Sequence, residues 1–200
     1  FPLDVKDEVK TKKVFENIIE KFQTLNICVF CTGIHDPESE KKLSGVKIRE
    51  IMETNFFGTV NCIMAVNKFF REKKSGHISL VSSVAGYRGL PAASGYCASK
   101  AALISLAESI YFDFKRHNVK ISLISPGFIK TPMTDKNKFP MPMIKSPTFA
   151  AEKMFIGLTK KNVFEIHFPV TFTILMKLLR IMPNWLYFLI AEKGIKKIKH

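Results

Sequence analysis

Short apolar runs alternate with longer amphipathic stretches along most of the chain. Runs of this length predict strands that are buried on both faces of a parallel sheet. The stretches with apolar residues at helical spacing predict the helices between them. The predicted strands are 26–31, 77–82, 120–125 and 163–168, with 1–5 as the tail of a further strand, and the predicted helices are 7–23, 46–74, 95–117 and 147–160. This order predicts an α/β fold with a Rossmann-like, doubly wound parallel sheet.

The long predicted helix at 46–74 contains a signal for an irregularity. Asn55 lies inside it, three residues before Gly58. Asn is unfavourable in a helix interior because its side chain competes for backbone hydrogen bonds. We therefore expect the helix to be interrupted at residues 54–58.

After the last predicted strand, two apolar helices follow at 171–182 and 184–197, divided by Pro183. Neither has the ~20 apolar residues that a membrane-spanning helix needs. The chain is expected to comprise a Rossmann-like domain at 1–168 and a helical extension at 169–200.

Two interpretations of this extension remain open. We favour the one in which the helices cover the subunit or a dimer interface, as buried amphipathic helices commonly do. In the other they make a peripheral membrane contact through 171–200, with Trp185, Tyr187 and Phe188 buried and the lysines facing anionic lipid.

The chain has 200 residues and a formal charge of +14. Its lysines are scattered and no nucleic-acid-binding motif accompanies them, so we expect no nucleic-acid partner. Cys28 and Cys31 form a CxxC without a second pair, so we expect no metal site. The sequence shows no secretory signal, which predicts a cytoplasmic protein, with membrane association as the variant.

The clearest chemical signal is the spacing of Ser83, Tyr96 and Lys100. Tyr96 and Lys100 are four residues apart at the start of a predicted helix, so they share a face. Ser83 follows a predicted strand and precedes a Gly- and Pro-containing loop. A nearby ammonium favours phenolate, which predicts that the pKa of Tyr96 is lowered from about 10 towards neutral pH.

This pattern of a Ser, a YxxxK and a strand–loop–helix context resembles the short-chain dehydrogenase/reductase family. The resemblance implies that Ser83 holds the substrate carbonyl oxygen and that Tyr96 exchanges a proton with it. It implies that Lys100 binds the nicotinamide ribose and lowers the pKa of Tyr96. Asn55, in the segment NFFGTV, matches the family's catalytic Asn, which continues a proton relay from Lys100.

The resemblance also implies residues that contact NAD or NADP, with NADP favoured. Asp4 matches the aspartate that contacts the adenine, although it could equally be a helix N-cap. Gly33 is the one residue that matches the family's NNAG segment, and we expect it to supply a permissive φ angle there. Pro126, Gly127, Ile129 and Thr131 match the PGxxxT segment, and Tyr96 and Lys100 complete the expected cofactor contacts.

The family's Gly-rich phosphate-binding turn is missing from these residues. The sequence is therefore expected to be an N-terminally truncated family member whose sheet is incomplete at its N-terminus. The strand at 26–31 then becomes an edge, and we expect the chain alone to bind NAD(P)H poorly.

The function expected from the sequence is NAD(P)-dependent interconversion of a carbonyl and a hydroxyl group by a homo-oligomeric enzyme. The Met-, Pro- and Phe-rich segment 131–149 is the predicted substrate lid, and its apolar lining predicts an apolar or lipid-like substrate. The alternative is a non-catalytic relative that acts as a protein- or membrane-interaction module.

Overall fold

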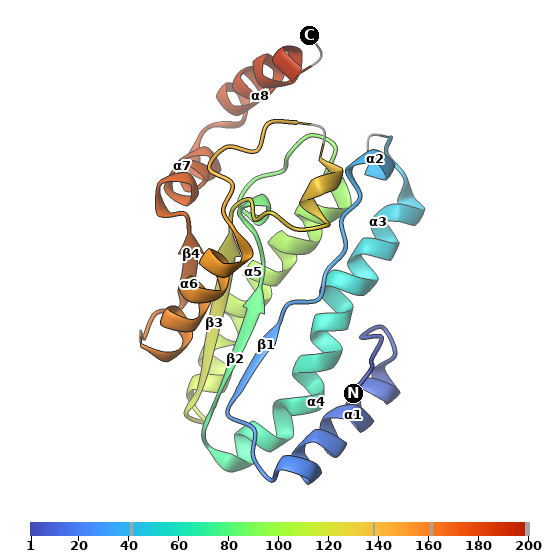
Figure 1. The fold of residues 1–200 in the computed structure, drawn as a ribbon, viewed down its shortest axis with the longest axis vertical. Coiled ribbons are helices and arrows are strands. Elements are labelled where there is room, and N and C mark those ends of the chain that lie inside the picture. Colours follow the sequence, from blue (N-terminus) through green and yellow to red (C-terminus); the bar gives the residue numbers. More distant parts are fainter. Residues whose placement is uncertain (41, 138, 161, 199–200) are drawn as a thin grey trace.

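The computed structural model describes residues 1–40, 42–137, 139–160 and 162–198. Within them, four parallel strands form one sheet in the order β1-β2-β3-β4. The strands are β1 (Ile27–Phe30), β2 (Gly76–Val81), β3 (Val119–Pro126) and β4 (Glu165–Phe168). Figure 1 shows the sheet between layers of helices, which confirms the predicted Rossmann-like α/β fold.

The helices fall close to the predicted ranges. Between β1 and β2, the predicted interruption is confirmed as a five-residue π-helix that contains Asn55. The elements are α1 (Glu8–Phe22), α2 (Pro37–Glu40), α3 (Gly45–Met52), the π-helix η1 (Glu53–Phe57), α4 (Gly58–Lys73), η2 (Val84–Gly86), α5 (Ser94–Lys115), η3 (Thr134–Lys136), α6 (Pro147–Thr159), α7 (Val170–Ile181) and α8 (Asn184–Ile198).

The two faces of the sheet pack into separate apolar cores because side chains alternate along each strand. Ile78 and Leu80 of β2 face the larger core, which α4 and α5 cover. Val81 at the end of β2 and Ile124 of β3 face the smaller core with Ala150 of α6. Helix α6 thereby covers the second face of the sheet over β3 and β4, and the parallel strands place their carboxyl ends at the same edge.

The strand predicted at residues 1–5 is wrong. β1 is an edge strand and pairs only with β2 among the described residues. A strand needs a partner for its backbone hydrogen bonds, and residues 1–5 meet α4 instead. The Val5 side chain is buried there, and its carbonyl oxygen accepts a hydrogen bond from Asn61 Nδ2 at 2.9 Å.

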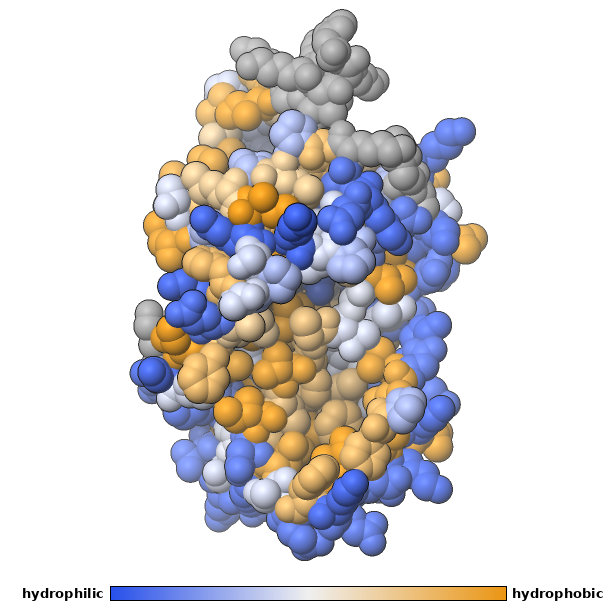
Figure 2. All heavy atoms as spheres, viewed as in Figure 1, coloured by the Kyte–Doolittle hydropathy of each residue, from blue (hydrophilic) through white to orange (hydrophobic). Residues whose placement is uncertain are grey.

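The expected edge position of the strand at 26–31 is confirmed, and the face of β1 away from α4 is open. Ile27 and Val29 point to that side and remain partly exposed, whereas Cys28 and Phe30 are buried on the other. Figure 2 shows apolar side chains gathered over the lower centre of this face.

The two C-terminal helices are confirmed on either side of Pro183. The division of the chain at residue 168 stays a prediction, and α7 adds Phe172 and Met176 to the larger core. No helix within the described residues is long and apolar enough to cross a membrane.

Candidate active site

Ser83 and Tyr96 meet at the carboxyl end of β2. Ser83 lies two residues beyond the strand and caps η2, because its Oγ accepts a hydrogen bond from Ala85 N at 3.1 Å. Tyr96 lies in the first turn of α5, and its phenol is close enough to Ser83 for that side chain to lower its pKa. The turn between β2 and α5 thus brings these two residues, thirteen apart in sequence, close together in space.

Lys100 lies one turn further along α5 and is buried. Its Nζ donates a hydrogen bond to the carbonyl oxygen of Val81 at 2.9 Å and lies 5.7 Å from the centroid of the Tyr96 ring. Ser82 fixes the helix from the strand side, because its Oγ donates to the Lys100 carbonyl oxygen at 2.8 Å. The structure therefore brings Ser83, Tyr96 and Lys100 together.

The predicted lowering of the Tyr96 pKa is wrong for this structure. Burial raises the pKa of Tyr96 to about 12, and the Ser83 side chain only partly opposes it. Burial also lowers the pKa of Lys100 to about 8, because a low-polarity surrounding disfavours the ammonium. The residue expected to stabilise the phenolate thus loses its own charge at a lower pH than an exposed lysine does.

Asn55 reaches the same region from the π-helix η1. Its Oδ1 accepts a hydrogen bond from Ile34 N at 2.7 Å, and its Nδ2 donates to the Ile34 carbonyl oxygen at 3.0 Å. The same Nδ2 donates to Ser99 Oγ of α5 at 3.0 Å. The irregular turn therefore lets one amide connect the segment after β1 with the helix that carries Tyr96 and Lys100.

Gly33 lies against Lys100 and Asn55, and its role differs from the expected one. Among the described glycines, the positive φ angle belongs to Gly76 and not to Gly33. A Cβ atom at Gly33 would lie 3.3 Å from Lys100 Nζ and 3.5 Å from Asn55 Oδ1. Glycine is therefore explained here by the space beside the lysine rather than by a special backbone angle.

The predicted PGxxxT segment follows β3 at the same edge of the sheet. Pro126 ends the strand, and Gly127 N donates to the Phe168 carbonyl oxygen at 2.7 Å. Ile129 forms a parallel bridge with Lys145, at the two ends of the segment that contains most of the predicted lid. The lid itself stays a prediction. Thr131 N donates to Thr134 Oγ1 at 2.9 Å.

Asp4 precedes α1, where its carboxylate organises a turn. It accepts a hydrogen bond from Lys6 N at 3.0 Å and lies 3.4 Å from Lys6 Nζ. The N-cap of α1 is Asp7 and not Asp4. The expected contact of Asp4 with an adenine stays a prediction.

Glu40 and His35 are site residues that the sequence analysis missed. Glu40 is buried, and its Oε2 accepts hydrogen bonds from Gly95 N at 2.7 Å and Tyr96 N at 3.2 Å. His35 Nδ1 lies 2.8 Å from Glu40 Oε1, and the His35 ring lies 4.4 Å from the Tyr96 ring, centroid to centroid. Glu40 thus caps α5 from 55 residues away, where the N-cap Ala93 offers no side-chain oxygen.

The packing of Gly86 on α5 leads to a prediction. A Cβ atom at Gly86 would lie 2.8 Å from the backbone carbonyl carbon and oxygen of Lys100. Because a backbone cannot give way like a side chain, Gly86→Ala is expected to lower the free energy of unfolding by about 1–3 kcal/mol. Chemical denaturation measures this change. Gly89→Ala is the matched control, since no atom lies within 4 Å of its added Cβ; equal effects of the two substitutions would contradict the close packing.

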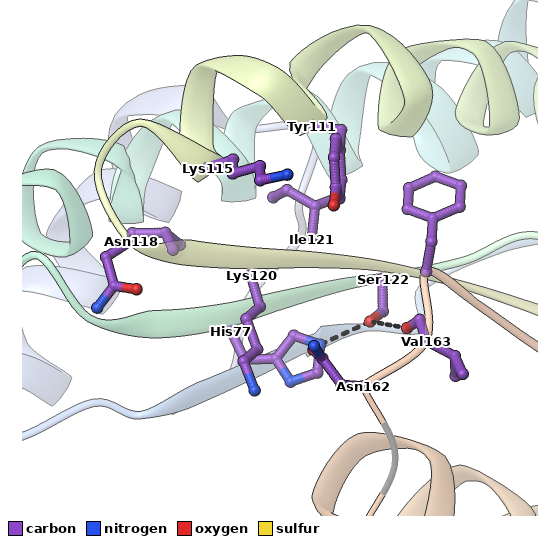
Figure 3. A pocket seen from close by; sticks show the side chains of 11 residues that line it. His77, Tyr111, Lys115, Asn118, Lys120, Ile121, Ser122, Asn162 and Val163 are labelled. Carbon is purple, nitrogen blue, oxygen red and sulfur yellow. Dashed lines mark hydrogen bonds between the residues drawn. The ribbon is translucent and has the colours of Figure 1, made fainter.

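A hollow of about 250 Å³ lies at the amino-terminal ends of β2 and β3, away from Tyr96 (Figure 3). In it, His77 Nε2 lies 2.7 Å from Ser122 Oγ, which donates to the Val163 carbonyl oxygen at 3.2 Å. Burial, with help from Lys120, lowers the pKa of His77 and favours its neutral form. His77 is thus a buried histidine of β2.

Within the part of the chain that the structure describes, no group of three or more His, Cys, Asp or Glu side chains is placed to hold a metal ion. The four cysteines are free thiols, three buried and Cys31 exposed.

A parallel α/β sheet with a Ser, a Tyr and a Lys at its carboxyl edge defines the class of protein. The model of the short chain dehydrogenase family matches residues 1–140. An uncharacterized oxidoreductase of Myxococcus xanthus is 34% identical over 163 residues, which are 82% of this chain and 64% of the relative. The chain therefore belongs to the short-chain dehydrogenase family.

Other relatives agree with this assignment. A 3-oxoacyl-(acyl-carrier-protein) reductase of Thermotoga maritima is 29% identical over 68% of this chain and 55% of the relative. The solved structure "ElxO with NADP Bound" has a TM-score of 0.72 at 24% identity and covers 84% of this chain and 75% of that one. The chain thus spans between about half and two thirds of the length of these curated relatives.

Proposed function

We propose that the natural protein carrying this chain is an NAD(P)-dependent oxidoreductase that interconverts a carbonyl and a hydroxyl group. The observation that supports this most is the convergence of Ser83, Tyr96 and Lys100, with Ser83 acting on the pKa of the Tyr96 phenol and Lys100 Nζ 5.7 Å from the centroid of the Tyr96 ring. A carbonyl oxygen placed between the two hydroxyls would accept a hydrogen bond from each. That arrangement stabilises the negative charge that develops on the oxygen during reduction.

Tyr96 acts in this proposal as the general acid for reduction. With a pKa of about 12, its phenol is protonated at neutral pH and can deliver a proton to the developing alkoxide. Ser83 orients the carbonyl oxygen. Asn55, bound to Ile34 and Ser99, holds the start of the proton path behind Lys100.

The residues present fit the nicotinamide half of the cofactor. Gly33 leaves space beside Lys100 Nζ that a Cβ atom would fill. Nζ uses one hydrogen bond for Val81 and, as an ammonium, has further N–H donors for ribose hydroxyls. Gly127, Ile129 and Thr131 would face the carboxamide and phosphates, with Pro126 ending the strand before them and Asp4 towards the adenine. The bound cofactor would supply or accept the hydride.

NADP is favoured over NAD, and the substrate is proposed to be apolar. The name "ElxO with NADP Bound" supports NADP by analogy, and the reductase name of the Thermotoga maritima relative supports an acyl-like substrate. A cleft of about 420 Å³ between the loop after η2 and α8 adds a physical argument. Its walls are mostly apolar and include one carboxylate; the lining residues are Gly89, Leu90, Pro91, Tyr187, Phe188, Ala191 and Glu192.

The protein is further proposed to form a homo-oligomer. Met64 of α4 and Phe112 of α5 are exposed apolar side chains on the helices that cover the larger core. Sedimentation of the purified chain checks this, with Phe112→Glu expected to shift it to monomer.

The function is tested on the natural protein that contains these residues. NADPH and NADH binding are measured by calorimetry, and cofactor oxidation is followed with a 3-oxoacyl thioester and with a short polar ketone. We expect tighter NADPH binding and faster turnover of the acyl substrate. A protein that binds neither cofactor and turns over neither substrate would instead be the non-catalytic interaction module.

A further inference from the structure

The outward faces of α7 and α8 expose an unusual density of large apolar side chains. Figure 2 shows them over the upper left of the molecule, where Figure 1 places these helices. Ile181 is 78% exposed and Trp185 is 66% exposed. The set, here called the α7–α8 face, consists of Val170, Ile174, Leu175, Leu178, Ile181, Trp185, Phe188, Leu189 and Ile190. Soluble proteins usually scatter such residues singly, and contiguous apolar patches mark interaction sites.

The exposed apolar residues are additional to the apolar residues with which α7 and α8 pack against the rest of the protein. Phe172 and Met176 of α7 are buried in the larger core, and Tyr187 of α8 is buried with its hydroxyl donating to the Gly89 carbonyl oxygen. The expectation that these helices cover the subunit therefore holds for one side of each. Their other side is apolar as well and lies outside.

Specific contacts fix the joint between the two helices. The Arg88 guanidinium donates to the Arg180 carbonyl oxygen at 3.1 Å and to Asn184 Oδ1 at 2.6 Å. It also lies 4.4 Å from the centroid of the Tyr187 ring. The α7–α8 face is thus presented in a set orientation, with a guanidinium at its joint.

The charges around the face are mainly basic. Arg180 is exposed at the end of α7, next to the Arg88 contacts. Glu165, on the body beside α7, is paired with Lys177 and Tyr87. In sequence, the chain continues after Glu192 with Lys193, Lys196 and Lys197.

We propose that the α7–α8 face is a docking surface for an anionic lipid membrane. Apolar side chains with an exposed Trp, bordered by Arg and Lys, match the acyl boundary and the anionic headgroups at once. A second copy of this chain matches less well, because pairing two such faces would bring their basic borders together on molecules of charge +14.

The docking direction would place the candidate active site close to the bilayer. In Figure 1, α7, α8 and the loop 131–146 lie at the end of the molecule towards which the strands point. An apolar substrate could then enter from the lipid. This consequence rests on the proposed function, whereas the docking itself does not.

Trp185 makes the test specific, since it is the single tryptophan of the chain. Its emission is recorded while vesicles of phosphatidylcholine, with or without phosphatidylglycerol, are added to the 200-residue chain. We expect a blue shift, and quenching by bromine-labelled acyl chains, with the anionic vesicles. Each Lys or Arg near an anionic surface strengthens binding roughly fivefold, so the anionic vesicles should bind about twentyfold more tightly or more.

Variants distinguish binding through the α7–α8 face from non-specific hydrophobic binding to vesicles. Leu178→Glu should weaken vesicle binding at least about tenfold, because it places a charge in the acyl boundary. Arg180→Gln should weaken binding to anionic vesicles and leave neutral vesicles unaffected. The matched control is Phe155→Glu, an equally exposed apolar residue on α6, which should bind as the unaltered chain does.

Two outcomes would overturn the proposal. One is an unchanged Trp185 emission with both vesicle types. The other is a blue shift that appears without lipid and grows with protein concentration. If Leu178→Glu abolished both this shift and a dimer seen in sedimentation, the face would be an interface between copies of the chain. Because vesicle binding needs no turnover, its failure is distinct from a failure of the proposed function.

Discussion

Replacing Tyr96 by Phe is expected to reduce turnover of the natural protein by about 10²–10⁴-fold, the usual contribution of a positioned proton donor. The substitution removes one oxygen atom and keeps the ring. Packing against His35, whose ring lies 4.4 Å away, therefore persists. Calorimetry should show NADPH binding within about threefold of the original, and a steady-state assay should show the loss in kcat rather than in KM.

Tyr111→Phe provides the matched control on the same helix. Tyr111 packs edge to face on Phe164 and lies at the opposite end of α5 from Ser83. Its loss should leave turnover unchanged. If the Tyr96 variant retained turnover, the acid would have to be another group, and the proposed roles of Ser83 and Tyr96 would fail together.

The sequence predicts the elements well because each is determined locally. The apolar run at 120–125 has a strong strand pattern and forms β3, paired on both sides. The Asn55–Gly58 signal correctly marks the π-helix. The strand at 1–5 fails for the opposite reason. Its sequence suits a strand, but a strand exists only with a neighbour, and residues 1–5 meet Asn61 instead.

The sequence predicts which residues form the candidate site better than it predicts their pKa values. Spacing alone places Tyr96 and Lys100 on one face. The direction of the Tyr96 pKa depends on burial, which outweighs its local partner. The role of Glu40 could not be predicted from the sequence either. Glu40 caps α5 from 55 residues away, so no local sequence pattern links the two. The hydrophobic periodicity of α7 likewise does not reveal its exposed apolar side. The pattern does not show which of the apolar residues are buried and which face outwards.

The buried Lys100 leads to the second large effect, which concerns stability. Lys100→Met keeps the volume of the side chain and removes its charge. The pKa of about 8 in the folded protein, against 10.5 for the exposed group, corresponds to a cost of about 3 kcal/mol for burying the ammonium. Loss of the hydrogen bond to Val81 offsets about 1 kcal/mol of the gain. At pH 7 the variant should therefore be more stable by about 2 kcal/mol, and inactive, as expected where a functional group is held at the expense of stability.

The pH dependence identifies the cause. Below pH 8 Lys100 is charged in both states, so the folded protein bears the full cost of burying it. Between pH 8 and 10.5 the unfolded chain binds the extra proton, so the stability of the original protein rises with pH in that window. The advantage of Lys100→Met should accordingly shrink through the window and reverse slightly above it, because only the lost Val81 hydrogen bond then remains. Urea unfolding at pH 7 and pH 10.5 measures both values, and other titrating groups cancel because both proteins share them. Lys68→Met, at an exposed position on α4, should show no such change. An advantage that stayed constant with pH would mean that packing, and not the buried charge, distinguishes the two proteins.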